Sequence, residues 1–170
     1  MKKRIQEFDL GYYFLRPIIE TSVRCHYGNV TFKGKKNLPA HGPYIIAPCH
    51  QSAMMDPLIV LMLTVKPVVF LCRSDIFEKP TARKILTFLK ILPVYRIRDG
   101  KESLSKNAEI FEKSRSVVLG GYPFCMMAEG NRSFSGETGF ISPATAKLVK
   151  ESGAGLITFA LHGGYLMNPR

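Results

Sequence analysis

Residues 44–65 read YIIAPCHQSAMMDPLIVLMLTV and contain both a structural and a chemical signal. The short apolar run at the start is typical of a buried strand, and a longer apolar run begins at Leu58. Between the two runs lie His50 and Asp56, and burying either side chain is costly unless it is paired. The pattern therefore indicates either a loop with satisfied polar groups or an imidazole that a carboxylate holds in place.

Apolar runs alternate with helical segments along the rest of the chain. Strands are expected at 44–47, 67–72, 92–97, 122–128 and 155–161, and helices at 81–92, 99–116 and 143–152. Ser142 and Pro143 are a good N-cap and first residue for the last helix, and Gly153 is expected to end it. Because the strands are apolar on both faces, the sequence predicts an α/β fold with a mainly parallel or mixed sheet flanked by helices.

The first 28 residues have the pattern of an amphipathic helix. Apolar residues recur at alternating three- and four-residue steps, at Ile5, Phe8, Tyr12, Leu15 and Ile19. Four more apolar residues widen this face and five basic residues flank it: Leu10, Tyr13, Phe14 and Ile18, and Lys2, Lys3, Arg4, Arg16 and Arg24. Pro17 is expected to kink or divide the helix. The segment is interpreted either as a helix that caps the domain core or as an interfacial helix on an anionic membrane surface.

Composition narrows the classes of partner. The chain has 170 residues, which suits one well-buried domain, and its formal net charge is +11. Such a charge suits nucleic acid, an anionic membrane surface or a phosphate-bearing substrate. The basic residues are scattered and no nucleic-acid-binding motif stands out, so no nucleic-acid partner is expected.

Targeting signals and cysteine usage indicate a protein that faces the cytosol. The residues after MKKR are too polar for the apolar core of a signal peptide. The longest apolar stretch, 57–72, is broken by Lys66 and Pro67, so no transmembrane span is expected. The cysteines lack metal-type spacing and are expected to be reduced thiols; they are Cys25, Cys49, Cys72 and Cys125.

Polar residues gather near the ends of three expected strands. These are residues 50–56 after the first strand, Arg96 near the end of the third, and residues 129–133 after the fourth. Ligands of open parallel sheets bind at the carboxyl ends of the strands. The three clusters are therefore candidates for one shared site.

His50 is the candidate general base of that site. A neutral imidazole can accept a proton near neutral pH, and a carboxylate such as Asp56 can orient the ring through its other nitrogen. Ser52 is too close in sequence to be placed on His50, and no G-x-S-x-G motif for a serine nucleophile occurs. The base is expected to activate a hydroxyl of the substrate, and the alternative is a purely structural pair.

The segment AEGNRS, residues 128–133, combines a carboxylate, a glycine and an arginine. Gly130 allows a ligand to approach the backbone closely, and Arg132 offers a planar fork that matches phosphate oxygens. Glu129 would hold Arg132 or accept a hydrogen bond from a substrate hydroxyl. Further cations follow the third strand, namely Arg96, Arg98 and Lys101. The alternatives are a surface turn with a salt bridge and an exposed basic edge.

Taken in order, CHQSAMMDP (49–57), LPVYRIRDG (92–100) and AEGNRS (128–133) resemble the motifs of the glycerolipid acyltransferase family. This family includes the 1-acyl-glycerol-3-phosphate acyltransferases and other lysophospholipid acyltransferases. The resemblance implies an enzyme of phospholipid biosynthesis that moves a fatty acyl group from acyl-CoA or acyl-carrier protein to the free hydroxyl of a lysophospholipid, such as 1-acyl-glycerol-3-phosphate. It implies no acyl-enzyme, no metal ion and no cofactor beyond the acyl donor.

The resemblance also implies roles and a location. His50 would be the general base, with Asp56 as its partner. The implied residues for the acceptor phosphate are Arg96, Glu129, Gly130 and Arg132, with Arg98 and Ser133 as further candidates. The chain would consist of a membrane-associating segment, 1–28, and an acyltransferase domain, 29–170, that lacks a C-terminal portion. Such a protein is expected to be peripheral, at the cytoplasmic face of a membrane.

The sequence departs from the family's pattern in three places. Five residues, not four, separate His50 from Asp56, and on a helix six positions turn through about 600°, which does not place both side chains on one face. The pair therefore requires His50 to lie in the loop before the helix, or an extra residue to bulge. Asn131 replaces the usual threonine, and the proline of the fourth motif is absent from residues 156–164. These departures leave a second interpretation open, a catalytically impaired or non-enzymatic basic module that binds membrane surfaces.

Overall fold

The computed structural model contains a five-stranded sheet whose strand pairs are all parallel. It describes residues 4–7, 9–39, 42–96, 101–130 and 139–163, except for the side chains of 101–104. The strands are β1 (Tyr44–Ile46), β2 (Val69–Arg73), β3 (Ile91–Val94), β4 (Phe124–Cys125) and β5 (Gly155–Ile157). Their order across the sheet is β3-β2-β4-β1-β5. The α/β fold expected from the sequence is confirmed.

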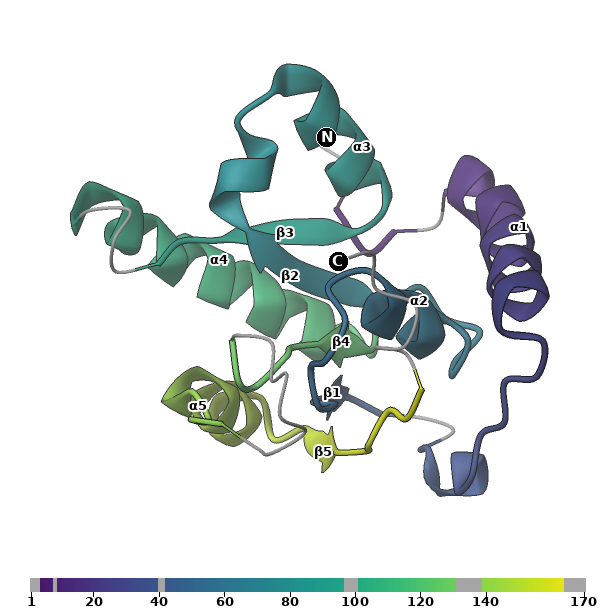
Figure 1. Ribbon diagram of the computed structural model, residues 1–170. Coiled ribbons are helices and arrows are strands. Elements are labelled where there is room, and N and C mark those ends of the chain that lie inside the picture. The colour runs from purple at the N-terminus through teal and green to yellow at the C-terminus, as the bar shows by residue number, and fades with distance from the viewer. Residues whose placement is uncertain (1–3, 8, 40–41, 97–100, 131–138, 164–170) are drawn as a thin grey trace.

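Helices cover both faces of this sheet (Figure 1). They are α1 (Leu10–Tyr27), α2 (Met55–Leu61), α3 (Pro80–Phe88), α4 (Lys101–Leu119) and α5 (Pro143–Ser152), with two 3₁₀ helices, η1 (Lys35–Asn37) and η2 (Ser74–Phe77). Successive residues of a strand point to opposite faces, so β1 contributes to two cores. Ile46 packs with Tyr12 of α1 and Val60 of α2, whereas Ile45 packs with Val117 of α4. The domain is therefore built in three layers.

Local signals set the ends of several elements. At the start of α5 the Ser142 hydroxyl accepts a hydrogen bond from the backbone N–H of Ala144 at 3.3 Å. Gly153 ends the same helix in the left-handed conformation, with φ at 62°. Both were expected from the sequence. Lys90 also has a positive φ, 63°, in the turn that separates α3 from β3, and α3 ends four residues earlier than the expected helix.

The N-terminal helix differs from its expected course. It begins at residue 10, where the Asp9 carboxylate accepts a hydrogen bond from the backbone N–H of Tyr12 at 3.3 Å. The expected start at Ile5 is wrong, since Ile5 precedes this cap, and Phe8 lies outside the described residues. Pro17 does not divide the helix, which is continuous through it.

Two opposite faces of α1 are apolar, where the sequence suggested one wide face. Tyr12 and Val23 are buried against the domain, and Leu15 and Ile19 line a small cavity on the same side. The opposite face, called here the α1 patch, consists of exposed residues: Leu10, Tyr13, Phe14 and Ile18. The first face caps the core, as one interpretation of the sequence proposed. None of the helices in the described ranges has the length and apolar character that crossing a membrane requires.

Phe124 of the central strand β4 is fully buried and packs in the core beneath α4 and α5. We expect Phe124→Ala to lower the free energy of unfolding by about 3–5 kcal/mol, because a cavity replaces the ring. The matched control is Phe140→Ala, whose side chain is 81% exposed and whose loss should cost less than about 0.5 kcal/mol. Urea unfolding measures both, and equal costs would contradict this description of the core.

Candidate active site

His50 and Asp56 meet at the carboxyl end of β1. The His50 Nδ1 atom lies 3.0 Å from the Asp56 Oδ2 atom. The geometric condition set by the six-position spacing is met, because His50 lies in the loop before α2 and Asp56 lies in the first turn of that helix. The loop, rather than a shared helical face, brings the two side chains together.

Three donors converge on one oxygen of Asp56. Its Oδ2 accepts hydrogen bonds from the backbone N–H groups of Gln51 and Ser52, each at 2.8 Å, in addition to the contact with His50. The side chain of Asp56 has an exposure of 0%, and its Oδ1 has no hydrogen-bond partner among the described residues. Charge-assisted hydrogen bonds and a position in the first turn of a helix both stabilise an anion. These interactions therefore offset the desolvation cost of burying the Asp56 carboxylate.

The same contacts fix the state of the imidazole ring. With Oδ2 as the acceptor, Nδ1 of His50 carries the ring proton and Nε2 remains as an acceptor. Within the described part of the chain, Nε2 of His50 receives no hydrogen bond, and the side chain is 16% exposed. The ring is therefore held on one side and can accept a proton on the other.

Ser52 shapes the loop that carries His50. It is fully buried, and its hydroxyl accepts a hydrogen bond from the backbone N–H of Met55 at 3.4 Å, at the start of α2. On the opposite side of the loop, the Cys49 N–H donates to the Phe159 carbonyl at 3.2 Å. The chain after β5 thus supports the segment before the histidine.

Glu129 and Gly130 follow β4, which is the direct neighbour of β1 in the sheet. The Glu129 Oε2 atom accepts a hydrogen bond from the backbone N–H of Gly139 at 3.2 Å. Gly130 has a φ of 66°, in the left-handed region, and an added Cβ would meet no atom within 4 Å. Backbone conformation rather than crowding therefore favours glycine here.

Arg96 follows the edge strand β3 and belongs to a different cluster. Its Nη2 lies 3.4 Å from the Asp75 Oδ2 atom, and Arg73 forms an ion pair with the same carboxylate. Sequence reasoning missed Arg73 and Asp75, although Arg73 is the last residue of strand β2 and Asp75 lies just after it. The rule that ligands bind at the carboxyl ends of strands could have identified them.

Sheet order decides which candidate residues come together. His50 and Glu129 extend from the neighbouring strands β1 and β4, whereas Arg96 follows β3, three strand intervals from β1. At about 4.8 Å an interval, this is about 14 Å between strand ends. Arg98, Arg132 and Ser133 lie outside the described residues, and so their place in the site is not described.

The charge of Asp56 extends to two neighbouring groups. The pKa of the Cys125 thiol on β4 is raised mainly by burial and, to a smaller extent, by the negative charge of Asp56. The same two causes, in the same order, raise the pKa of Tyr27 at the end of α1. The buried carboxylate therefore lies within electrostatic reach of both β4 and α1.

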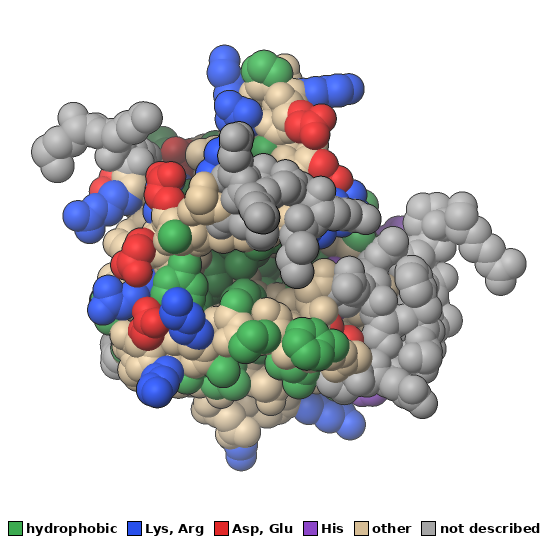
Figure 2. Space-filling model, turned by 90° about the vertical axis from the view of Figure 1, so that its left-hand side faces the viewer, with side chains coloured by type: hydrophobic (Ala, Val, Ile, Leu, Met, Phe, Trp, Pro, Cys, Tyr) green, Lys and Arg blue, Asp and Glu red, His purple; other side chains and the backbone are tan. Residues whose placement is uncertain are grey.

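The carboxyl-end side of the sheet is hollowed. Helix α4 begins on the left of Figure 1, and Figure 2 views the molecule from that side. Hydrophobic side chains form the floor of a hollow in the centre of this view, and charged side chains lie to its left and above it. A cavity of about 1130 Å³ lies along β3, and its lining includes Asp75 and Tyr95 but neither His50 nor Asp56. No group of three potential metal ligands occurs within the described ranges.

Comparison with known proteins identifies the family. The chain matches the family model described as Acyltransferase over residues 29–162. The protein therefore belongs to the acyltransferase family, and its recognition as a glycerolipid acyltransferase relative from three motifs is confirmed. No curated protein sequence matches it significantly.

The fold is similar to that of a crystal structure of the 1-acyl-sn-glycerophosphate (LPA) acyltransferase PlsC from Thermotoga maritima. The TM-score is 0.69 at 18% sequence identity, and the match covers 100% of this chain and 65% of that chain. The present chain thus spans about two thirds of the length of this relative. At such low identity the similarity concerns the fold.

The carboxylate of Asp75 provides a test of the Arg73–Asp75–Arg96 cluster. A hydrogen bond from Arg73, and to a smaller extent the charges of Arg73 and Arg96, lower the pKa of Asp75 below its ordinary value of 3.8. We expect Arg73→Met to raise the Asp75 pKa more than Arg96→Met does, as measured by a ¹³C-carboxyl NMR titration. The reverse order would show that this cluster is arranged differently. Because the pKa is lowered by folding, the stability from this group is present at neutral pH and is lost as the pH falls through that pKa.

Proposed function

We propose that this protein is an acyltransferase that acts on a lysophospholipid such as 1-acyl-glycerol-3-phosphate, with acyl-CoA or acyl-carrier protein as the donor. The observation that carries the proposal is the His50–Asp56 pair at the end of β1, with Nε2 available, in a chain of the acyltransferase family. Family membership supports the reaction class, and the ring geometry supports the role of His50. The relative of known structure acts on 1-acyl-sn-glycerophosphate by its title, and we extend that substrate class to this chain.

In the proposed reaction His50 is the general base. Its Nε2 takes the proton of the acceptor hydroxyl while the hydroxyl oxygen attacks the thioester carbonyl carbon. The tetrahedral intermediate then collapses, the carbon–sulfur bond breaks, and the imidazolium returns the proton to the departing sulfur, so that a free thiol leaves and neutral His50 is restored. Asp56 keeps the ring oriented and stabilises the imidazolium, as the carboxylate does in a Ser-His-Asp triad. The serine of such a triad is replaced here by the acceptor's own hydroxyl.

Arginine side chains would bind the phosphate of the acceptor. Arg96 is the proposed phosphate ligand among the described residues, and Arg132 of the third motif is a second proposed ligand, because guanidinium groups match phosphate oxygens. Glu129 and the left-handed turn at Gly130 would shape the part of the pocket next to His50, because they follow β4, the neighbour of β1. No metal ion or further cofactor enters this mechanism.

The base is tested with His50→Ala. We expect transfer of a labelled acyl group from acyl-CoA or acyl-carrier protein to 1-acyl-glycerol-3-phosphate to fall by about 10²–10⁴-fold, the usual contribution of general base catalysis. His26→Ala, an exposed histidine on α1, is the matched control and should retain full activity. Retained transfer in His50→Ala would remove this mechanism. A wild-type protein that binds liposomes tightly without turnover would favour the alternative of a basic membrane-binding module.

Membrane association is the second part of the proposal. The α1 patch exposes four large apolar side chains, which is the composition of an interfacial helix, and the formal net charge of +11 favours an anionic surface. A lipid acceptor would then reach the site from the surface to which the protein is bound.

The α1 patch is tested by the double substitution Phe14→Ser and Ile18→Ser. We expect binding to vesicles that contain an anionic phospholipid to weaken by at least about tenfold, because burial of each side chain contributes roughly 1.5–3 kcal/mol. Phe140→Ser, which removes an exposed phenylalanine away from α1, is the control and should bind as the wild type does. Vesicle sedimentation measures the effect, and unchanged binding of the double variant would exclude α1 as the docking surface.

A further inference from the structure

The helix that carries Asp56 is too short to hold its own position. α2 contains seven residues, and isolated helices of this length are not stable in water. Its placement must therefore come from contacts with the rest of the domain. At its first turn these contacts involve Asp56, as described above, and the opposite end has a separate set of partners.

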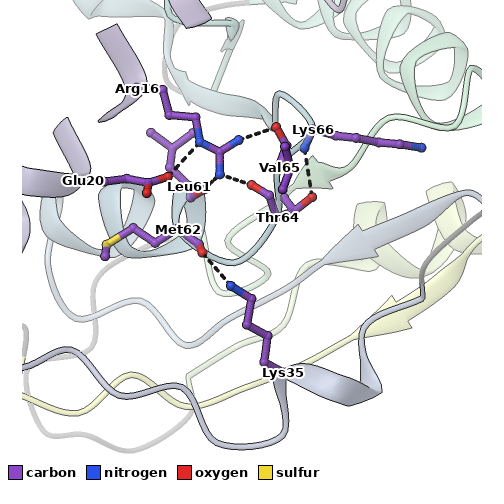
Figure 3. Close-up of polar contacts among 8 residues, drawn as sticks. All are labelled: Arg16, Glu20, Lys35, Leu61, Met62, Thr64, Val65 and Lys66. Carbon is purple, nitrogen blue, oxygen red and sulfur yellow. Dashed lines mark hydrogen bonds and ion pairs between the residues drawn. The ribbon is translucent and has the colours of Figure 1, made fainter. Parts of the chain in front are cut away.

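Arg16 of α1 binds the end of α2 (Figure 3). Its guanidinium donates to the Leu61 carbonyl at 2.8 Å and also to the carbonyls of Thr64 and Val65. Its Nε forms an ion pair with Glu20, one turn further along α1, at 2.8 Å. A cation suits this position, because the last carbonyls of a helix lack partners within the helix and carry partial negative charge.

This arrangement corrects the sequence interpretation of Arg16. The sequence placed it among the basic residues that flank an interfacial helix, whereas its side chain is only 14% exposed and turns toward the domain. A second cation reaches the same end from the other side, since Lys35 of η1 donates to the Met62 carbonyl at 3.2 Å (Figure 3). Two segments distant in sequence therefore anchor α2.

Apolar packing between α1 and α2 is incomplete. A cavity of about 80 Å³ lies between them, lined on one side by Leu15 and Ile19 and on the other by Pro57, Leu58 and Leu61. Protein interiors are normally packed without such voids, and side chains that line one lose van der Waals contacts. The polar contacts of Arg16 therefore add to an apolar contact between α1 and α2 that leaves part of the space between the helices unfilled.

We infer that Arg16 is a positioning residue for the proposed reaction. It fixes the end of α2, and Asp56 lies on the same rigid helix about 7.5 Å away along the axis, five residues at 1.5 Å each. A shift of α2 would move the Asp56 carboxylate relative to the His50 ring. The inference depends on the proposed function for its catalytic consequence, but its structural consequence, the state of the His50 ring, is measured independently.

The kinetic test compares Arg16→Met with Arg24→Met. Arg24 is an exposed arginine of the same helix, so both variants remove one charge from α1 and keep a long apolar stem. We expect Arg16→Met to lower kcat about tenfold with KM for the acyl donor within twofold, because small displacements of catalytic groups reduce rates strongly. Arg24→Met should match the wild type, and Arg16→Lys, which can still donate to one of the carbonyls, should recover part of kcat.

The spectroscopic test does not require activity. The tautomer of His50 is read from the ring ¹⁵N NMR signals of labelled protein, and these signals are assigned by their absence in His50→Ala. In the wild type and in Arg24→Met the ring should be the Nδ1-protonated tautomer. In Arg16→Met we expect a shift toward the tautomer mixture of a free imidazole. If the wild type shows this tautomer but no acyl transfer, the proposed function fails and the tautomer comparison still decides the role of Arg16.

Two results would overturn the inference. One is a kcat of Arg16→Met within twofold of that of Arg24→Met, and the other is an unchanged His50 tautomer in Arg16→Met. Should Arg16→Met fail to fold, as judged by circular dichroism, Arg16→Lys and Arg24→Lys decide the question. A lower kcat in Arg16→Lys, by threefold or more, with a shifted tautomer supports the inference, and equal values for both lysine variants reject it.

Discussion

The buried carboxylate of Asp56 is the constraint on which the rest of the site depends. A charge without solvent contact is tolerated only when donors surround it, and Oδ2 has three of them within 3.0 Å. Two are backbone N–H groups of the loop, so the same carboxylate shapes the loop and orients the His50 ring. The imidazole is therefore part of a folded unit that includes the loop and the first turn of α2.

Two architectural features place the other candidate residues relative to this unit. The parallel sheet directs the carboxyl ends of its strands to one side, so the residues after β1 and β4 are immediate neighbours. Residues at and after the ends of β2 and β3 form a separate charged cluster, in which Asp75 contacts both Arg73 and Arg96.

Helix α1 combines tasks that are usually assigned to separate elements. One face packs on the core and, through Arg16, holds the end of α2. The other exposes four large apolar side chains. Since a rigid helix links these two faces, a protein bound to a lipid surface through the α1 patch would have its candidate catalytic pair held by the same helix.

From the sequence alone, the fold class, the caps of α5 and the family could be predicted, because these depend on local chemistry. Apolar runs specify buried strands. The Ser142 hydroxyl caps the start of α5, and Gly153 can adopt the left-handed conformation that ends this helix. The family is recognised from the order of its motifs along the chain. The start of α1 and the role of Arg16 could not be predicted. Periodicity shows that a residue can lie on a given face, but not which partner that face will meet.

Tertiary structure alone decided whether His50 reaches Asp56. The spacing of six residues permits the contact only if a loop replaces a helical turn, and the backbone N–H groups of that loop need an acceptor that Asp56 supplies. The backbone carbonyls that Arg16 binds lie 45 to 49 residues away. No local pattern contains such contacts, because they exist only after strands, helices and loops have packed together.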